Sequence, residues 1–152
     1  MRRLSILILA AVLSAAAWAN EVAVAPVVDA SALPPLGEVW RETNPYRGLP
    51  EALAVGQSAY NQACARCHGA DAATRAAPAP DLRNLDRGCR RIVGSELKAR
   101  CMADNDAYFA KTVRRGKTIV GVVHMPPWDG VLPQEVAWAI QVFFEARARE
   151  GR

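Results

Sequence analysis

The sequence is poor in the side chains that bind metals and carry out catalysis. Its 152 residues include only two histidines, four cysteines and three methionines. A second CxxC or an HxxxH that could complete a four-ligand zinc site is missing, which disfavours structural zinc. Only one histidine, His124, lies outside the CxxCH segment, and no acid-base or nucleophile cluster is recognisable. We therefore do not expect this chain to break bonds in a substrate.

Long hydrophobic runs and internal repeats are also missing. The longest apolar block lies within residues 1–19, and it is shorter than the roughly 20 residues that span a bilayer. This segment starts with a basic pair and ends in AWA, which is typical of a secretory signal peptide cleaved after Ala19. We expect export to the periplasm and no stable membrane insertion after cleavage. A retained membrane anchor is the alternative.

The charge of the chain is modest. The formal net charge is +4, and removal of residues 1–19 takes away two arginines and no acidic residue, which leaves +2. A nucleic-acid partner is therefore not predicted. With 51% hydrophobic residues, the chain can bury one compact core, so a single domain is expected.

The organisation along the chain predicts an extended arm followed by a helical domain. Residues 20–49 show no helical or alternating period and contain many prolines, but Trp40 and Tyr46 suggest that this arm packs on the domain. A mobile spacer is the alternative. Within residues 50–152 we expect three helices, which start at Pro50, Asp104 and Pro133, and loops elsewhere, including most of residues 70–103. The β-branched run before Pro126 and Pro127 is not expected to form a regular element. The fold class is therefore predicted to be all-α.

The segment QACARCHGADA carries the strongest chemical signal. Cys64 and Cys67 are followed directly by His68. One helical turn places the two thiols where they can add to the two vinyl groups of a haem, and the next residue directs its imidazole to the iron. Covalent haem c is installed outside the cytosol, which agrees with the predicted leader. Zinc binding and a thiol-disulfide switch are the alternatives, but a switch would follow a strand rather than a helix.

The second axial ligand decides what such a haem does. A closed iron favours electron transfer, whereas an open position favours ligand binding or catalysis. Met125 is the favoured ligand because Pro126 and Pro127 restrict the backbone beside it. His124 is the adjacent rival, and Met102 is better explained as a core-filling side chain. The predicted iron ligands are thus His68 and Met125.

Two cysteines remain once haem takes the first pair. Cys89 and Cys101 enclose the segment CRRIVGSELKARC, which has no strong hydrophobic period of its own. In an oxidising compartment we expect them to form a disulfide that closes this loop. Two free buried thiols are the alternative.

Several segments together resemble the class I c-type cytochromes. They are GQSAYNQACARCHG, a Pro-Asp-Leu after the histidine, a late MPPW and a closing aromatic helix. The resemblance implies the class I cytochrome c fold, with one haem domain and the extended arm in front of it. It also implies that the first and last helices cross at Gly56, Tyr60 and Phe143. In addition, it implies that the Pro80 carbonyl accepts the second N–H of His68 and that Leu82 presses on a haem face.

A narrower resemblance suggests a redox partner. The arm segment WRETNPYRG, the Cys89 and Cys101 pair and the region around HMPPWDGVLPQEV are similar to periplasmic cytochromes c that serve PQQ-dependent alcohol dehydrogenases, and more distantly to cytochrome c-L. The resemblance implies a monomeric electron carrier that accepts electrons from such a dehydrogenase and passes them to a terminal oxidase or another cytochrome. A fixed haem subunit of a larger oxidoreductase, or a haem protein with an open iron, are the alternatives.

Overall fold

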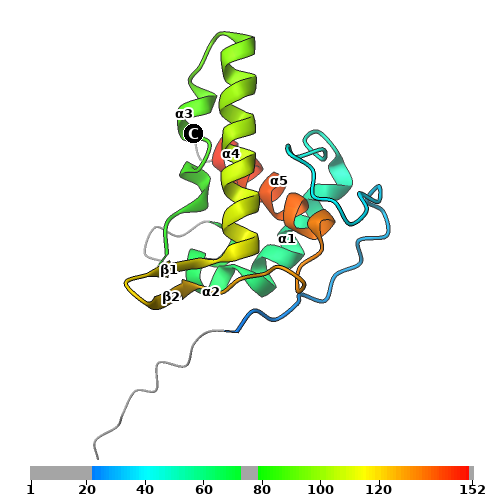
Figure 1. Cartoon of the computed structure of the whole chain (residues 1–152). Helices are drawn as coiled ribbons and strands as arrows, with labels where there is room; N and C mark the ends of the chain where they lie inside the picture. Colours follow the sequence, from blue (N-terminus) through cyan, green and yellow to red (C-terminus); the bar gives the residue numbers. More distant parts are fainter. Residues whose placement is uncertain (1–21, 73–78, 151–152) are drawn as a thin grey trace, which may run out of the picture.

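The structure, a computed structural model, describes residues 22–72 and 79–150. The predicted leader lies outside these residues. In chain order the elements are α1 (Pro50–Ala63), α2 (Ala65–His68), η1 (Ala70–Ala72), η2 (Leu82–Asn84), α3 (Arg87–Arg90), α4 (Ser95–Arg115), β1 (Lys117–Ile119), β2 (Val122–Met125) and α5 (Gln134–Glu150). Figure 1 shows α1 and α5 packed across each other, with α4 beside them.

A glycine sets the distance between α1 and α5. A Cβ atom at Gly56 would lie 2.5 Å from the carbonyl carbon of Ala139, so only glycine allows the backbones to approach this closely. One turn further along α1, the rings of Tyr60 and Phe143 lie 5.3 Å apart. The crossing expected from the resemblance is therefore present. Both side chains are fully buried, and burial raises the pKa of the Tyr60 hydroxyl above its usual value.

The helix α4 is longer than predicted. It begins at Ser95 after Gly94, not at Asp104, and it ends at Gly116, as expected from a glycine with a positive φ of 67°. The expectation of a loop over residues 95–103 is therefore wrong. That part of α4 buries no side chain, so it has no apolar stripe by which the sequence could reveal it. The buried face of α4 begins at Asn105 and includes Phe109 and Val113.

The prediction of a helical domain is confirmed, with one small departure from all-α. Strands β1 and β2 form an antiparallel hairpin in which Thr118 pairs with Val123. The two prolines do not prevent this hairpin because they follow β2 rather than interrupt it. Val120 occupies the turn with a φ of +49° and is 97% exposed. The β-branched run thus forms a regular element that the sequence analysis did not predict.

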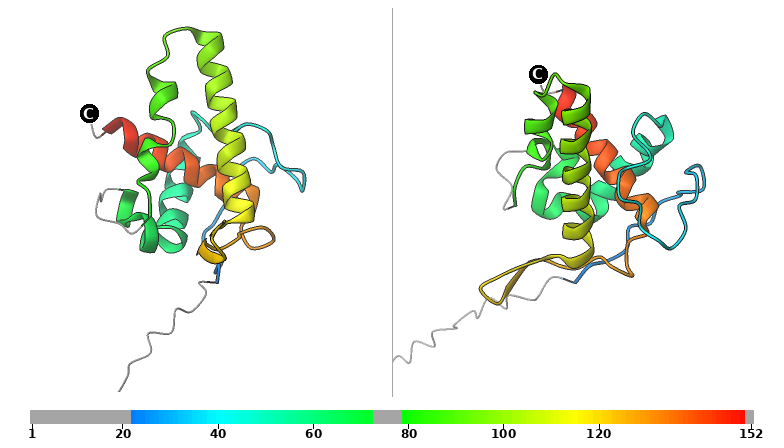
Figure 2. Two further views of the ribbon diagram at one scale, coloured as in Figure 1. Left: turned by 60° about the vertical axis from the view of Figure 1, so that its left-hand side comes forward. Right: turned by 45° about the horizontal axis from the view of Figure 1, so that its top comes forward.

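The arm packs on the helical domain, although residues 22–49 contain no helix or strand. Leu33 and Tyr46 are buried in the core, and the ring of Trp40 lies 5.8 Å from that of Trp138 on α5. Gln134 of α5 bridges to the arm, since its amide donates to the carbonyls of Gly37 and Val39. In Figure 2 the arm runs along the start of α5 in both views. A freely mobile spacer does not describe this segment.

A buried polar network anchors the end of the arm. The Arg47 guanidinium pairs with Asp106 on α4 and with Glu145 on α5, and both carboxylates are fully buried. These partners raise the pKa of Arg47, although desolvation acts in the opposite direction. Asn44 adds a bond to the Trp138 carbonyl at 3.0 Å and a bond to Gln141 at 2.8 Å. Buried charges need such pairing, so Asp106 and Glu145 of the helical domain depend on Arg47 of the arm.

Candidate functional site: a haem attachment site

The CxxCH segment forms a tight turn at the end of α1. Cys64 ends α1, where its N–H donates to the Tyr60 carbonyl at 2.8 Å, and it directly precedes α2. The N–H groups of Cys67 and His68 both donate to the Cys64 carbonyl, at 3.2 and 2.9 Å. The Tyr60 hydroxyl donates to the His68 carbonyl at 3.2 Å. The two thiols and the imidazole therefore come from one helical turn at the end of a helix that buries one face.

The imidazole of His68 is oriented by a backbone carbonyl. Its Nδ1 lies 2.8 Å from the oxygen of Pro80. A carbonyl oxygen can only accept, so Nδ1 carries the proton and Nε2 keeps its lone pair. Ala79 fixes the loop on the other side, since its N–H donates to the Cys67 carbonyl at 3.0 Å. This is the arrangement of a ligating histidine whose second nitrogen is held by an outer partner, and the donor set fits a haem.

The Cys64 thiol does not have the low pKa that a thiol-disulfide switch requires of its attacking thiol. Burial, and next to it the neighbouring Cys67, raise the pKa of the Cys64 thiol to about 12. A switch needs an attacking thiol with a lowered pKa, because only the thiolate is nucleophilic at neutral pH. In the part of the chain that the structure describes, no group of three or more histidine, cysteine or carboxylate side chains gathers to hold a metal ion. The raised pKa of the Cys64 thiol agrees with its use in a thioether rather than as an attacking thiol.

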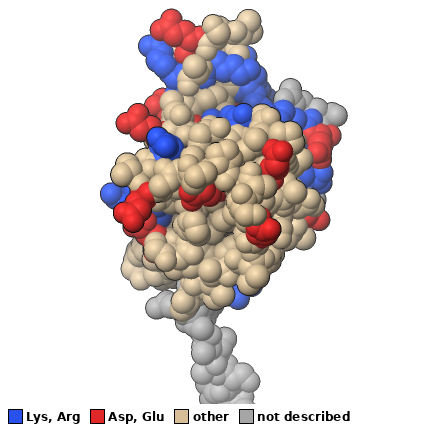
Figure 3. Space-filling model, turned by 90° about the vertical axis from the view of Figure 1, so that its right-hand side faces the viewer, with Lys and Arg blue, Asp and Glu red and all other residues tan. Residues whose placement is uncertain are grey.

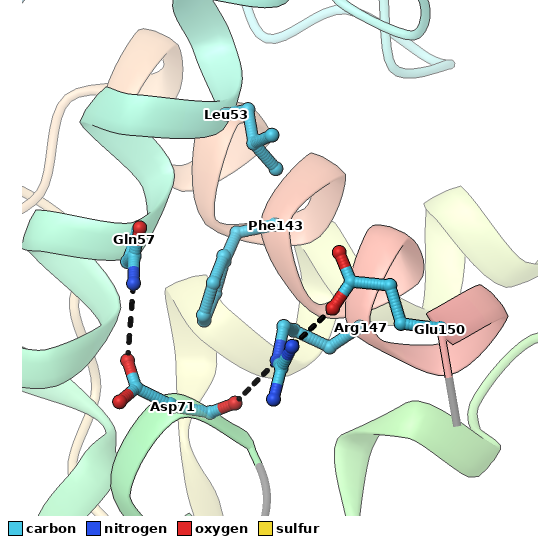
Figure 4. A pocket seen from close by; sticks show the side chains of 6 residues that line it. All are labelled: Leu53, Gln57, Asp71, Phe143, Arg147 and Glu150. Atoms are coloured by element: carbon cyan, nitrogen blue, oxygen red, sulfur yellow. Dashed lines mark hydrogen bonds and ion pairs between the residues drawn. The ribbon is translucent and has the colours of Figure 1, made fainter.

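The turn that follows α2 is held by hydrogen bonds from side chains of α1 and α5. The Asn61 amide donates to an Asp71 carboxylate oxygen at 2.6 Å, and Gln57 donates to the same oxygen at 3.3 Å. These bonds lower the pKa of Asp71. Arg147 of α5 donates to the Asp71 carbonyl at 3.1 Å. Figure 4 shows the shallow pocket around these residues, which is lined by Leu53, Gln57, Asp71, Phe143, Arg147 and Glu150. None of the predicted haem-binding residues lines this pocket, so it is separate from the CxxCH motif.

Met125 is placed by the end of α4. It is the last residue of β2 and is half-buried against the core. A Cβ atom at Gly116 would lie 2.8 Å from Pro126 and Pro127 backbone atoms, so glycine lets this loop lie directly on the helix end. The Trp128 N–H donates to the Val113 carbonyl at 3.0 Å, and Trp128 is itself buried. The hairpin and α2 lie at the same end of the molecule (Figure 1).

The other predicted residues fall in different places. Leu82 begins η2 and is half-buried against the core, so its contact with a haem face stays a prediction. His124 is exposed on β2, on the opposite side of the strand from the half-buried Met125. Met102 lies on α4, one residue after Cys101, among the turns that bury no side chain, so the core-filling role predicted for it is not evident.

The second cysteine pair lies away from α2. Cys89 of α3 and Cys101 of α4 are joined by a disulfide in the structure, with Cα atoms 5.5 Å apart and a sequence separation of 12. Cys89 is buried, while Cys101 is half-buried. The bond ties the start of α4 to α3 above the core.

Comparisons with known proteins decide the family. A family model described as "Cytochrome C oxidase, cbb3-type, subunit III" matches residues 51–143. The chain is also 38% identical over 138 residues to cytochrome c550 of Pseudomonas aeruginosa, which covers 88% of this chain and 85% of the relative. The chain belongs to the cytochrome c family. This cytochrome is an electron carrier rather than an enzyme, and its family carries one covalently bound haem c, for which Cys64 and Cys67 provide the motif. No solved structure matches it significantly.

The basic residues of α3, α4 and the hairpin do not form one patch. They include Arg90, Arg91, Arg114, Arg115 and Lys117. Arg90 is at α3, whereas Arg114 ends α4, and α4 is about 30 Å long at 1.5 Å per residue. Arg114 is also engaged, since it pairs with Asp129 at 3.0 Å and its guanidinium lies 5.4 Å from the Trp40 ring centre. Within residues 22–72 and 79–150, no helix is long and apolar enough to cross a membrane.

Proposed function

We propose that this cytochrome is a periplasmic electron carrier whose iron is bound by His68 and Met125. The observation that carries the proposal is the His68 to Pro80 hydrogen bond of 2.8 Å beside the cysteine pair, because it leaves Nε2 as the donor to the iron. Once attached through Cys64 and Cys67, the haem supplies one-electron chemistry at the iron. A thioether as the second ligand gives a higher reduction potential than a second histidine would.

The proposed electron donor is a PQQ-dependent alcohol dehydrogenase. The arm, the disulfide pair and the segment around Met125 support this choice because they resemble the cytochromes c that serve such enzymes. A terminal oxidase or another cytochrome is the proposed acceptor. The same proposal includes three further points. They are export with removal of residues 1–19, a monomeric state, and a Cys89–Cys101 disulfide in the mature protein.

Stopped-flow mixing with a reduced quinoprotein alcohol dehydrogenase tests the donor. The proposal expects rapid reduction of the haem, followed through its visible absorption, with a rate that rises with dehydrogenase concentration. Reduction by small chemical reductants but not by the dehydrogenase would reject the donor while keeping the carrier role.

The axial ligands need a separate test. Oxidised protein is expected to show the weak far-red absorption band of iron bound to thioether sulfur, and Met125→Ala should remove it. The variant His124→Ala should keep the band, because that imidazole lies on the exposed side of β2. Rapid binding of carbon monoxide by the reduced wild-type protein at neutral pH would instead indicate an open iron.

A fixed subunit of a larger oxidoreductase is the second candidate. The description of the matching family model, which names an oxidase subunit, favours it. The arm is anchored within the chain by the ion pairs of Arg47 with two buried carboxylates, so no partner chain is needed to order it. This argues against a fixed subunit. Purification of the native protein distinguishes the two, since a fixed subunit would co-purify with its complex.

A further inference from the structure

The net positive charge of the chain lies in the extension that the Cys89–Cys101 disulfide closes. We call residues 87–101 the basic tip. They include five basic residues and one acidic residue, which leaves 14 basic and 14 acidic residues in the rest of the chain. The entire formal net charge of +4 is therefore located in these 15 residues. Figure 3 shows basic side chains gathered towards the top of the molecule, while the broad lower face carries few of them.

The basic tip stands clear of the core. Figure 1 and the left view of Figure 2 show the start of α4 projecting above the other helices, at the opposite end of α4 from the hairpin and α2. Residues 93–100 are all exposed, and the bond between Cys89 and Cys101 holds the extension to α3. The cations Arg87, Arg91 and Lys98 are exposed. Apolar burial does not explain why this extension is kept in one conformation.

The apex of the basic tip is apolar. Val93, in the bend that joins α3 to α4, is 98% exposed, and Leu97, in the first turn of α4, is 55% exposed. Around them the cations come from both helices. An exposed apolar apex with cations on both helices, and Glu96 as the one acidic residue of the basic tip, suits a bilayer with anionic headgroups, because the cations attract the surface and the apolar side chains enter the interface. The centre of a protein interface is enriched in aromatic residues, and residues 87–101 contain none.

We propose that the basic tip binds the surface of an anionic phospholipid bilayer, reversibly and without insertion of a helix. Arg90 is held by the Asp86 carboxylate and Arg100 pairs with Glu96 at 3.7 Å. The exposed cations Arg87, Arg91 and Lys98, together with the two apolar contacts, give weak binding, which suits a protein that must also diffuse. In this orientation the hairpin and α2 point away from the membrane, so the haem end stays accessible to a soluble donor. The biological setting rests on the proposed export, but lipid binding itself needs no electron donor.

Vesicle sedimentation with the purified haem-loaded protein tests the proposal. The probes are vesicles of phosphatidylglycerol and phosphatidylcholine in equal parts, and vesicles of phosphatidylcholine alone. Wild-type protein should sediment with the anionic vesicles at low salt, and not with the neutral ones, and should be released at about 0.5 M salt because charges are then screened. The double variant Arg91→Glu with Lys98→Glu should lower the partition at least 25-fold, since each cation is worth about fivefold at such a surface.

A matched control lies on the same helix. Lys111→Glu with Arg115→Glu makes the same change in net charge at two exposed residues of α4 outside the basic tip. This pair should lower the partition less than about threefold, and Val93→Asp should lower it about threefold. Haem absorption and the thermal midpoint check that each variant is folded.

Three results would overturn the proposal. They are failure of the wild-type protein to bind anionic vesicles, an equal loss in the control pair, and a larger loss in the hairpin variant Val120→Asp than in the variants of the basic tip. Weaker binding of the Arg91→Glu, Lys98→Glu variant to the alcohol dehydrogenase, with unchanged binding to lipid, would also overturn it. That result would show the surface to be a protein-docking site and would leave the carrier function intact.

Discussion

The two cysteine pairs of this cytochrome lie in opposite surroundings. Cys64 and Cys67 follow a helix with five buried residues, and the backbone around them is fixed by hydrogen bonds from Tyr60, His68 and Ala79. Cys89 and Cys101 tie α3 to α4, and between them residues 93–100 are all exposed to solvent. Packing in the core positions the first pair. The second pair lies where few side chains are buried, and its disulfide holds the chain there instead.

The comparison explains why the same residue type serves two purposes. Packing at α1 and α5 holds the first pair still without a covalent bond between the sulfurs, so both thiols remain available to a cofactor. At the basic tip, apolar burial is too small to order the chain, and a covalent link limits the unfolded states instead. The spacing of three residues or twelve then decides whether a pair fits one helical turn or closes a loop.

The largest effect is expected from removing the first pair. Cys64→Ala with Cys67→Ala should abolish covalent haem attachment, because no other described thiol lies on the same turn as His68. The mass of the purified protein should equal that of the bare mature chain, and haem staining after denaturing electrophoresis should be negative. Cys89→Ser with Cys101→Ser serves as the control and should keep the haem. Loss of haem in the control would contradict the assignment of the two pairs.

A large loss of stability is expected from filling the helix crossing. Gly56→Val places side-chain atoms into the Ala139 backbone, which cannot move without separating α1 from α5. We expect a loss of more than about 3 kcal/mol in the free energy of unfolding, at the upper end of overpacking effects. Urea unfolding followed by circular dichroism measures it. Gly88→Val is the matched control, because a Cβ there meets no atom within 4 Å, and it should cost much less.

Removal of the second pair should cost less than the change at the crossing. Cys89→Ser with Cys101→Ser opens a loop with a sequence separation of 12, which corresponds to about 3 kcal/mol at most on loop-closure entropy. Hydrogen exchange should show the main loss of protection within residues 89–103, while amides of α1 and α5 change little. Equal loss of protection in α1 would show that the basic tip is part of the core.

The sequence revealed the parts of the molecule that depend on local patterns. The CxxCH turn follows from the spacing of Cys64, Cys67 and His68, whereas the helix crossing at Gly56 was implied by the resemblance to class I c-type cytochromes. The start of α4 at Ser95 was not predictable, because no apolar period marks a helix that buries nothing. The anchoring of Arg47 by Asp106 and Glu145 depends on residues 59 and 98 positions away, so no local pattern signals it.

The smallest effect is expected in the arm. In the sequence, only its aromatic residues indicated that the arm packs on the domain. The Tyr46 hydroxyl donates to the Pro34 carbonyl, and the ring is buried. Loss of this bond in Tyr46→Phe should cost about 1 kcal/mol at pH 8, measured by urea unfolding. Burial, with a smaller contribution from Glu135, raises the pKa of Tyr46 to about 12, above its ordinary value of 10.0.

The raised pKa makes this cost depend on pH. Above pH 10 the unfolded chain loses the Tyr46 proton while the folded chain keeps it, so wild-type stability falls as pH rises from 10 to 12. The phenylalanine variant lacks this titration, and the difference between the two proteins should therefore narrow between pH 8 and pH 11. If the difference in stability between the two proteins stays constant or widens, Tyr46 is not buried and hydrogen-bonded to Pro34 in the folded protein.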